Sequence, residues 1–217
     1  GKSTLIRILL SLLPMQSGEI ILNGENFKSL SLKERAKLIG YVPQNEKPNF
    51  AFSVLDMIML GKNASIGLFK APSKKDIDDA YNAAILAGCK HLLEQKIDEL
   101  SGGQMQLVLI ARAIISKPKL LIMDEPTSFL DTTHQNEILS LISRLNNQGM
   151  AVMFSSHHLD HAFMISHKSL LLNGEQGYIY GDTKEILNEQ NLYDLFNTNF
   201  IMAQIEGKTR ILPRWSI

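Results

Sequence analysis

The segment that decides the fold of this 217-residue chain lies between Leu100 and Asp131. It opens as Leu100-Ser101-Gly102-Gly103-Gln104, continues as a helix-length apolar run to about residue 116, and then reads Leu120-Leu121-Ile122-Met123-Asp124-Glu125-Pro126. A short apolar run closed by two carboxylates predicts a buried strand of a parallel sheet, whose carboxyl end is where such sheets bind ligands. A serine and two glycines opening a helix leave backbone N–H groups for an anion. The segment therefore combines an acidic pair with an anion-binding helix start.

Composition excludes several classes of function. The 22 basic residues balance the 22 acidic ones, so nothing indicates a nucleic-acid or acidic-membrane binder, and we expect no nucleic-acid partner. The single cysteine, Cys89, excludes an intramolecular disulfide and fits a reducing compartment. No apolar run approaches membrane-spanning length, and the N-terminus lacks the pattern of a signal peptide. The length allows one large domain or two small ones with a substantial core.

The N-terminus matches the end of a phosphate-binding loop. Gly1-Lys2-Ser3-Thr4 occupies the last positions of the pattern G-x-x-x-x-G-K-[ST], in which the lysine reaches the β- and γ-phosphates and the next hydroxyl ligates Mg²⁺. Taken alone, the tetrapeptide favours an ordinary helix start, and it indicates a phosphate-binding loop only together with the rest of the chain. The apolar run from Leu5 to Leu13 predicts a buried helix that ends at Pro14.

The middle of the chain is predicted to be helical between two strand-rich regions. Residues 39–44 read as a strand broken by Pro43, which leaves Gln44 at the carboxyl end of the strand. The amide of Gln44 could ligate a metal there, or Gln44 could be an ordinary surface residue. The methionines at 57 and 59 fit helix core better than a contact surface. Residues 75–87 have helical spacing, and Cys89 is expected to fill a small apolar gap. We therefore interpret residues 45–116 as an inserted helical subdomain.

The remainder alternates between helices and strands. Residues 133–147 predict a helix whose apolar positions are Ile138, Leu139, Leu141, Ile142 and Leu145. Residues 151–155 read as a second buried strand, followed by Ser156-His157-His158. A hairpin is expected around residues 173–177, with strands at 170–172 and 178–180. Short amphipathic helices are expected at 183–188 and 191–197.

The order and spacing of these signals resemble the ATP-binding subunit of ABC transporters over nearly the whole chain, to about Phe196. Gly1 to Thr4 matches the end of Walker A, Gln44 the Q-loop, Ser101 to Gln104 the signature, and Asp124-Glu125 Walker B. Asp131 lies at the D-loop and His157 matches the switch histidine. The resemblance implies an α/β P-loop NTPase fold with a mostly parallel central sheet, an inserted α-helical subdomain and a small antiparallel β portion.

The implied organisation divides the chain into two parts. Residues 1–44 and 117–217 would form the RecA-like ATP-binding core, and residues 45–116 the helical subdomain that carries the signature. Residues that precede Gly1 in this family are absent from the sequence, including the first glycines of the phosphate loop and the aromatic residue that stacks on adenine. We expect the complete protein to be longer, and this stretch alone to bind ATP weakly on an incomplete sheet.

The resemblance also implies the roles of the site residues. Those expected to act in catalysis are Glu125, as general base, with His157, Gln44 and Lys2. Those expected to bind ATP are Gly1, Lys2, Ser3, Thr4, Gln44, Ser101, Gly102, Gly103, Gln104, Asp131 and His157. Ser3, Gln44 and Asp124 are expected to hold Mg²⁺. His158 and His161 lie near His157 in sequence and are interpreted as structural, although the family often has an acidic residue at 158. Met105 and Phe129 also depart from the family pattern.

Partners follow from the same resemblance. In this family the signature segment completes the ATP site of a second subunit, so we expect a head-to-tail homodimer of this chain. Integral membrane permease subunits and, indirectly, a substrate-binding protein would be the other partners, with the chain peripheral at the cytoplasmic face of the inner membrane. A soluble ABC ATPase of DNA repair or translation is the alternative. It would need long coiled-coil insertions between Gln44 and Ser101, or two cassettes in one chain.

A narrower resemblance concerns the transported substrate. The run Ser53-Val54-Leu55-Asp56-Met57-Ile58-Met59-Leu60-Gly61, followed by Gly67-Leu68-Phe69, is similar to the ATPases of importers for iron–siderophore, haem, cobalamin and molybdate. The ending at residues 181–187 and 191–193 is similar to the same group. The transported substrate is chosen by other subunits, so the sequence predicts a metal-containing substrate without naming one.

Overall fold

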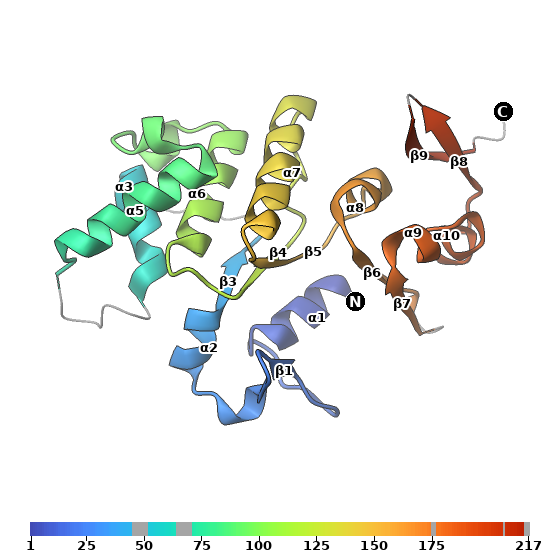
Figure 1. The fold of residues 1–217 in the computed structure, drawn as a ribbon, viewed down its shortest axis with the longest axis horizontal. Coiled ribbons are helices and arrows are strands. Elements are labelled where there is room, and N and C mark those ends of the chain that lie inside the picture. Colours follow the sequence, from blue (N-terminus) through green and yellow to red (C-terminus); the bar gives the residue numbers. More distant parts are fainter. Residues whose placement is uncertain (45–51, 64–70, 175–176, 206, 215–217) are drawn as a thin grey trace. The chain divides into compact units, whose positions relative to one another are not determined.

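The computed structural model describes the chain except residues 45–51, 64–70, 175–176, 206 and 215–217 (Figure 1). The run Gly67-Leu68-Phe69 therefore lies outside the described residues. The chain divides into two compact units, one of residues 5–155 and one of residues 1–4 with 156–217. None of the helices in the described ranges has the length and hydrophobicity to cross a membrane.

A parallel three-stranded sheet forms the centre of the larger unit. Its strands β3 (Ile39–Val42), β4 (Leu120–Met123) and β5 (Ala151–Phe154) lie in the order β3-β4-β5. The register aligns Val42, Met123 and Phe154 at one end, so the residues that follow all three strands meet at the same edge. Strand β4 is buried from Leu121 to Met123, which confirms the strand predicted before Asp124.

The prediction of a second buried strand at residues 151–155 is wrong in one respect. Strand β5 forms, but Ala151 is exposed and the other three residues are only half-buried. The reason is its place in the sheet, since β5 pairs with β4 on one side and is an edge strand among the described strands. A strand at an edge loses the cover that a central strand receives from both neighbours.

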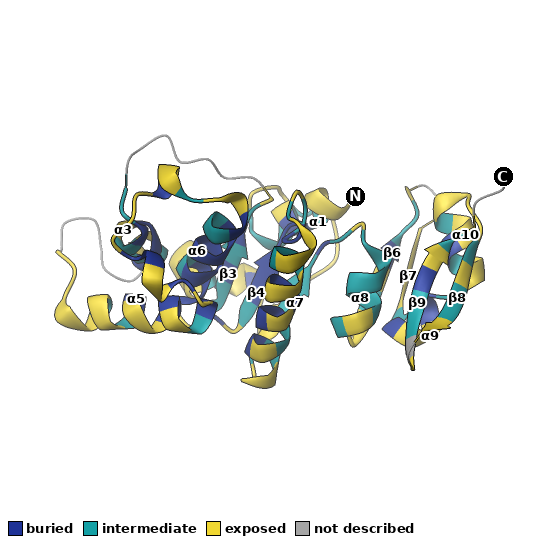
Figure 2. Ribbon diagram, turned by 90° about the horizontal axis from the view of Figure 1, so that it is seen from above, coloured by how far each residue is buried: buried dark blue, intermediate teal, exposed yellow. Residues whose placement is uncertain are grey.

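Every regular element described between β3 and β4 is helical. They are α3 (Val54–Met59), η2 (Leu60–Lys62), α5 (Lys74–Ala87), η3 (Lys90–Leu92), η4 (Ile97–Glu99) and α6 (Gly102–Ile114). Helices α3, α5 and α6 pack on one another (Figure 1), and α6 is the most buried of the three (Figure 2). Met57, Ile58 and Cys89 are buried, which confirms core positions for Met57 and the cysteine, whereas Met59 is only half-buried.

Two glycines let α6 lie directly on its neighbours. A side chain at Gly40 of β3 would place its Cβ 2.5 Å from the backbone oxygen of Ala113, and one at Gly61 would lie 2.6 Å from Ile115 Cγ2. The hydroxyl of Ser116 also donates to the Gly61 carbonyl at 2.7 Å. Only glycine allows backbones to approach this closely.

Helix α7 (Thr132–Asn147) buries one face against the sheet. Its buried residues are Ile138, Leu139, Leu141, Ile142 and Leu145, the five positions that the helical period predicts. Asp131 caps its N-terminus by accepting from the backbone N–H of His134 at 2.9 Å.

The predicted buried helix over residues 5–13 is wrong in length and burial. Helix α1 (Lys2–Leu9) buries Ile6 alone, and Leu12 is 66% exposed. The helix ends before Pro14 because Ser11 adopts a left-handed conformation with φ 60°. Beyond it, β1 (Ile21–Leu22) and β2 (Glu25–Asn26) form a short hairpin, and α2 (Leu32–Leu38) begins with Ser31 as its N-cap.

Over residues 156–174, 177–205 and 207–214, the smaller unit forms two antiparallel hairpins and three helices. Strands β6 (Lys168–Leu172) and β7 (Tyr178–Asp182) pair as predicted, followed by α9 (Thr183–Ile186) and α10 (Glu189–Phe196). The sequence analysis missed α8 (Leu159–Ile165) and the hairpin of β8 (Phe200–Ile205) and β9 (Lys208–Pro213). The core of this unit consists of Leu171, Ile186, Leu187, Leu192 and Ile211.

A charged cluster ties η2 to α5 in the helical region. The ammonium of Lys62, whose side chain is 11% exposed, lies 2.7 Å from Asp76 and 2.5 Å from Asp79. Hydrogen bonds from Lys62 are the largest cause that lowers the pKa of each carboxyl group. Burial alone would lower the pKa of Lys62, but the two carboxylates outweigh it and raise that pKa.

We expect Lys62→Met to destabilise the fold more than Lys117→Met, because Lys117 lies 3.5 Å from Asp79 but is 80% exposed. The carboxyl groups have lowered folded pKa values, so their contribution is present above about pH 4 and is lost as pH falls through those values. The raised pKa of Lys62 keeps its contribution until the pH exceeds 10.5. Thermal denaturation of the wild type and both variants, at pH 7 and in acid, measures the loss of stability and its dependence on pH. Equal midpoints for the two variants at pH 7 would contradict it.

Candidate active site

Two carboxylates follow β4 and are held by a serine that follows β5. Asp124 continues the pairing of the sheet, since its backbone N–H donates to the Val42 carbonyl at 2.9 Å, and it is buried. The hydroxyl of Ser155 donates to Asp124 Oδ1 at 2.5 Å and accepts from the backbone N–H of Glu125 at 2.9 Å. Ser155 therefore fixes both acidic residues at once.

The side chain of Glu125 is oriented by two further donors. Gln44 Nε2, beyond the end of β3, donates to Glu125 Oε2 at 3.0 Å. The hydroxyl of Ser128 donates to the same oxygen at 2.9 Å. Glu125 has φ 47°, a left-handed backbone conformation that is uncommon outside glycine. The amide and the two carboxylates thus meet at one edge of the sheet.

This donor set fits a hard divalent cation. Carboxylate, amide and hydroxyl oxygens suit Mg²⁺, which is usually held by one or two protein carboxylates together with phosphate oxygens and water. Over residues 1–44, 52–63, 71–174, 177–205 and 207–214, no three His, Cys, Asp or Glu side chains gather into a metal-binding group. The site fits a cation that arrives with a phosphate ligand better than a permanent structural metal.

The glycine-rich segment at Ser101 forms the capped start of α6. Ser101 Oγ accepts from the backbone N–H of Gln104 at 3.3 Å, while Gln104 Oε1 accepts from the backbone N–H of Ser101 at 2.9 Å. Ser101 and Gly102 are exposed, and Gly103 is buried against α7. Asp131 is exposed beside this segment, and hydrogen bonds from the backbone and ring of His134 lower its pKa.

The other predicted residues belong to the smaller unit. Gly1, Lys2, Ser3 and Thr4 are all exposed at the start of α1. His157 is exposed, and its ring centroid lies 4.1 Å from that of His158. The His158 centroid lies 4.6 Å from that of His161, whose pKa is lowered by burial and by the neighbouring histidines.

The structure thus groups the predicted site residues in three places. One group is Gln44, Asp124 and Glu125; a second is Ser101 to Gln104 with Asp131; the third is Gly1 to Thr4 and His157 in the other compact unit. Sequence reasoning missed Ser155 and Ser128. The signal for Ser155 was its place directly after β5, because residues that end neighbouring parallel strands share one edge.

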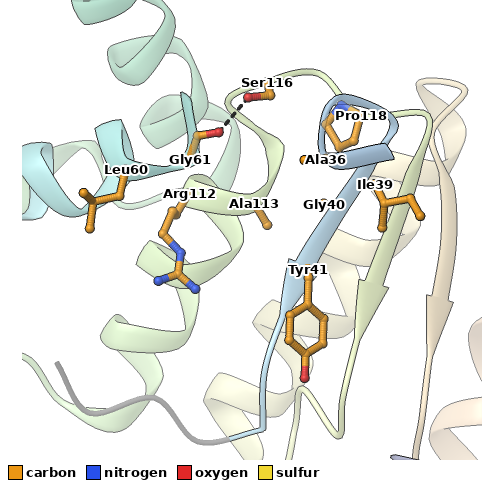
Figure 3. A pocket seen from close by; sticks show the side chains of 10 residues that line it. All are labelled: Ala36, Ile39, Gly40, Tyr41, Leu60, Gly61, Arg112, Ala113, Ser116 and Pro118. Carbon is orange, nitrogen blue, oxygen red and sulfur yellow. Dashed lines mark hydrogen bonds between the residues drawn. The ribbon is translucent and has the colours of Figure 1, made fainter. Parts of the chain in front are cut away.

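A hollow of about 200 Å³ lies away from the carboxylates, near the start of β3 (Figure 3). Its lining joins α2, β3, η2 and the C-terminal part of α6. Arg112 and Ala113 line it from α6, and Gly40 and Pro118 lie near the starts of β3 and β4 (Figure 3). The acidic pair at the opposite end of β4 is therefore not part of this hollow.

Comparisons with known proteins place this geometry in a family. The model of the family described as ABC transporter matches residues 1–128. An uncharacterized ABC transporter ATP-binding protein of Haemophilus influenzae is 40% identical over 92% of this chain and 76% of its own length. The molybdate import ATP-binding protein of the same organism is 39% identical over 96% of this chain and 77% of its own length.

A solved structure agrees with this assignment. It is described as a metal-chelate type ABC transporter in an inward-facing conformation, with a TM-score of 0.87 and 37% identity over 99% of this chain and 82% of that one. The resemblance drawn from the motifs is thereby confirmed, as is the α/β P-loop fold. The chain belongs to the ABC transporter family, as an ATP-binding subunit that hydrolyses ATP to drive transport.

Proposed function

We propose that this ATP-binding subunit powers import of a metal-containing substrate, such as an iron chelate, haem, cobalamin or molybdate, through permease subunits. The meeting of Gln44, Asp124 and Glu125 at the carboxyl edge of the sheet carries the ATPase part of this proposal. The relative named for molybdate import, the solved metal-chelate type transporter and the run at residues 53–61 support the substrate class.

The proposed organisation follows the motifs. Residues 1–44 and 117–217 form the ATP-binding core, and residues 45–116 form the helical subdomain that carries the signature. The helical character of all described elements between β3 and β4 supports this division. In the cell the subunit lies at the cytoplasmic face of the inner membrane, bound to the permease and served by a substrate-binding protein.

In the proposed site Gly1 to Thr4 hold the phosphates. Lys2 neutralises the β- and γ-phosphate charge, and Ser3, Gln44 and Asp124 offer oxygen ligands to Mg²⁺. When bound, Mg²⁺ supplies neutralisation of the charge that develops on the phosphates. The hydrogen bond from Ser155 engages Oδ1 of Asp124, and Oδ2 is the oxygen proposed for Mg²⁺.

Glu125 is the proposed general base for the attacking water. A base must lie within hydrogen-bond reach of the proton that it takes, and its carboxylate must be held in one direction. Gln44 and Ser128 hold it so, by donating to the same oxygen. His157 is the proposed contact to the γ-phosphate, supported by its place directly after the Ser155-Ser156 pair.

The second half of each ATP site comes from another copy in this proposal. Ser101 and Gly102 are exposed at a helix start, next to the buried Gly103 and the half-buried Gln104, and the exposed Asp131 carboxylate lies beside them. Such a start suits the phosphates of ATP held by a partner chain. In a head-to-tail homodimer each of the two ATP molecules is bound by the phosphate loop of one chain and the signature segment of the other. Two-fold symmetry makes the two sites equivalent.

Glu125→Gln is expected to lower ATP hydrolysis at least ~10²-fold, because the amide cannot accept a proton from water. ATP binding should persist and an ATP-bound dimer should accumulate, since Gln44 and Ser128 can still hold a side chain of the same shape. Phosphate release and size-exclusion chromatography with ATP measure the two effects. Wild-type turnover in this variant would remove Glu125 from the role of base.

Ser155→Ala is expected to cost about 1–3 kcal/mol of unfolding free energy, because it leaves buried groups of Asp124 and Glu125 without their partner. Ser128→Ala is the matched control, since it also removes a hydroxyl bonded to Glu125 but from a less buried position. Urea denaturation of both variants gives the comparison. A Ser155→Ala protein as stable as Ser128→Ala would show that Ser155 does not hold the pair.

The importer assignment is tested with the protein expressed in its own host. We expect a tagged subunit to co-purify from detergent-solubilised membranes with an integral permease, and its deletion to reduce uptake of one labelled metal-containing substrate. Recovery from the soluble fraction with DNA-repair or ribosomal proteins instead would contradict the assignment. Loss of uptake of a substrate that holds no metal would correct the substrate class alone.

A further inference from the structure

His134, in the first turn of α7, contacts both Asp131 and Gly103. These two residues belong to the group that is proposed to serve ATP held by a second copy of the chain. Its ring Nδ1 lies 2.7 Å from Asp131 Oδ2, and its backbone N–H donates to Asp131 Oδ1 at 2.9 Å. A carboxylate can only accept hydrogen bonds, so the Nδ1–H of the ring is the donor. Asp131 is therefore held by two donors from one residue.

The opposite contact of His134 is with the signature segment. A Cβ added to Gly103 would overlap the imidazole, reaching Cγ and Cδ2 and lying 2.7 Å from Nε2. The ring thus occupies the space that a Cβ at position 103 would need, and only glycine leaves room for it there. The ring cannot move away without breaking its bond to Asp131.

Neighbouring contacts fix both ends of this bridge. The reciprocal bonds between Ser101 and Gln104 set the first turn of α6. Gln135 Nε2 donates to the carbonyls of Leu130 at 3.0 Å and Thr127 at 3.3 Å, which ties the loop before Asp131 to α7. One imidazole therefore connects two segments that are each held by their own hydrogen bonds.

We propose that His134 is a positioning residue that sets the spacing between Asp131 and the Ser101–Gly103 backbone, the groups offered to the ATP of a second copy. This rests on the proposed function, because it assumes that these groups act in trans. The role differs from that of Lys2, Gln44 and Glu125, which serve ATP held by the same chain. A change at His134 should thus affect turnover of the dimer and spare the binding of nucleotide to a single chain.

The test compares His134→Ala and His134→Asn with Glu137→Ala, an exposed change on the same helix. We expect kcat to fall about ten-fold in His134→Ala, while the Kd of the single chain for a fluorescent ATP analogue stays within about two-fold. His134→Asn keeps a donor for Asp131 but lacks the ring over Gly103, so its kcat should fall by less. Glu137→Ala should match wild type.

A second pair of variants tests the contact itself through stability. Gly103→Ala should lower the thermal midpoint because its methyl group overlaps the ring. Adding His134→Ala removes the overlap and should raise the midpoint above that of Gly103→Ala alone. A double variant no more stable than the single one would overturn the contact.

The outcomes separate this inference from the proposed function. Wild-type turnover in either His134→Ala or His134→Asn overturns the positioning role. A loss of single-chain nucleotide affinity that matches the loss of kcat also overturns the positioning role, because it indicates a merely structural one. Ser101→Arg serves as the reference, since it should abolish turnover and dimerisation. If Ser101→Arg hydrolyses ATP normally, the shared-site proposal fails, whatever His134 does.

Discussion

The close approach of α6 to Gly40 and Gly61 is the constraint on which the larger unit depends. Any side chain at either glycine would overlap the helix or its neighbours, so the helix, β3 and η2 can have only this spacing. Protein interiors are packed at nearly crystalline density and transmit such displacements instead of absorbing them. The helical region is therefore joined to the sheet through backbone contacts that allow little adjustment.

This joint links the two groups of polar residues that the larger unit carries. The strand that contains Gly40 leads to Gln44, which bonds to Glu125, while the helix on top of it begins at Ser101. A displacement of α6 along its axis would therefore move the signature segment and, at the same time, press on β3.

The sequence predicts the elements whose residues carry strong local signals. Helix α7 shows its core face through the helical period, and β4 is recognised because it is apolar, short and closed by acids. Edge position is not encoded locally, and this is why the burial of β5 was overestimated. The hairpin of β8 and β9 was missed because neither strand alternates clearly, and both are stabilised mainly by each other and by Ile211 in the core.

The site was predictable as a set of residue types but not as a set of contacts. Motif spacing identifies Gln44, Asp124 and Glu125, whereas the hydroxyl of Ser155 emerges only from the pairing of β5 with β4. The left-handed backbone of Glu125 has a further consequence. A glycine there would relax the chain, so selection for stability alone would remove the carboxylate. Stabilised versions of this protein, by consensus or by design, should therefore be made with position 125 held constant.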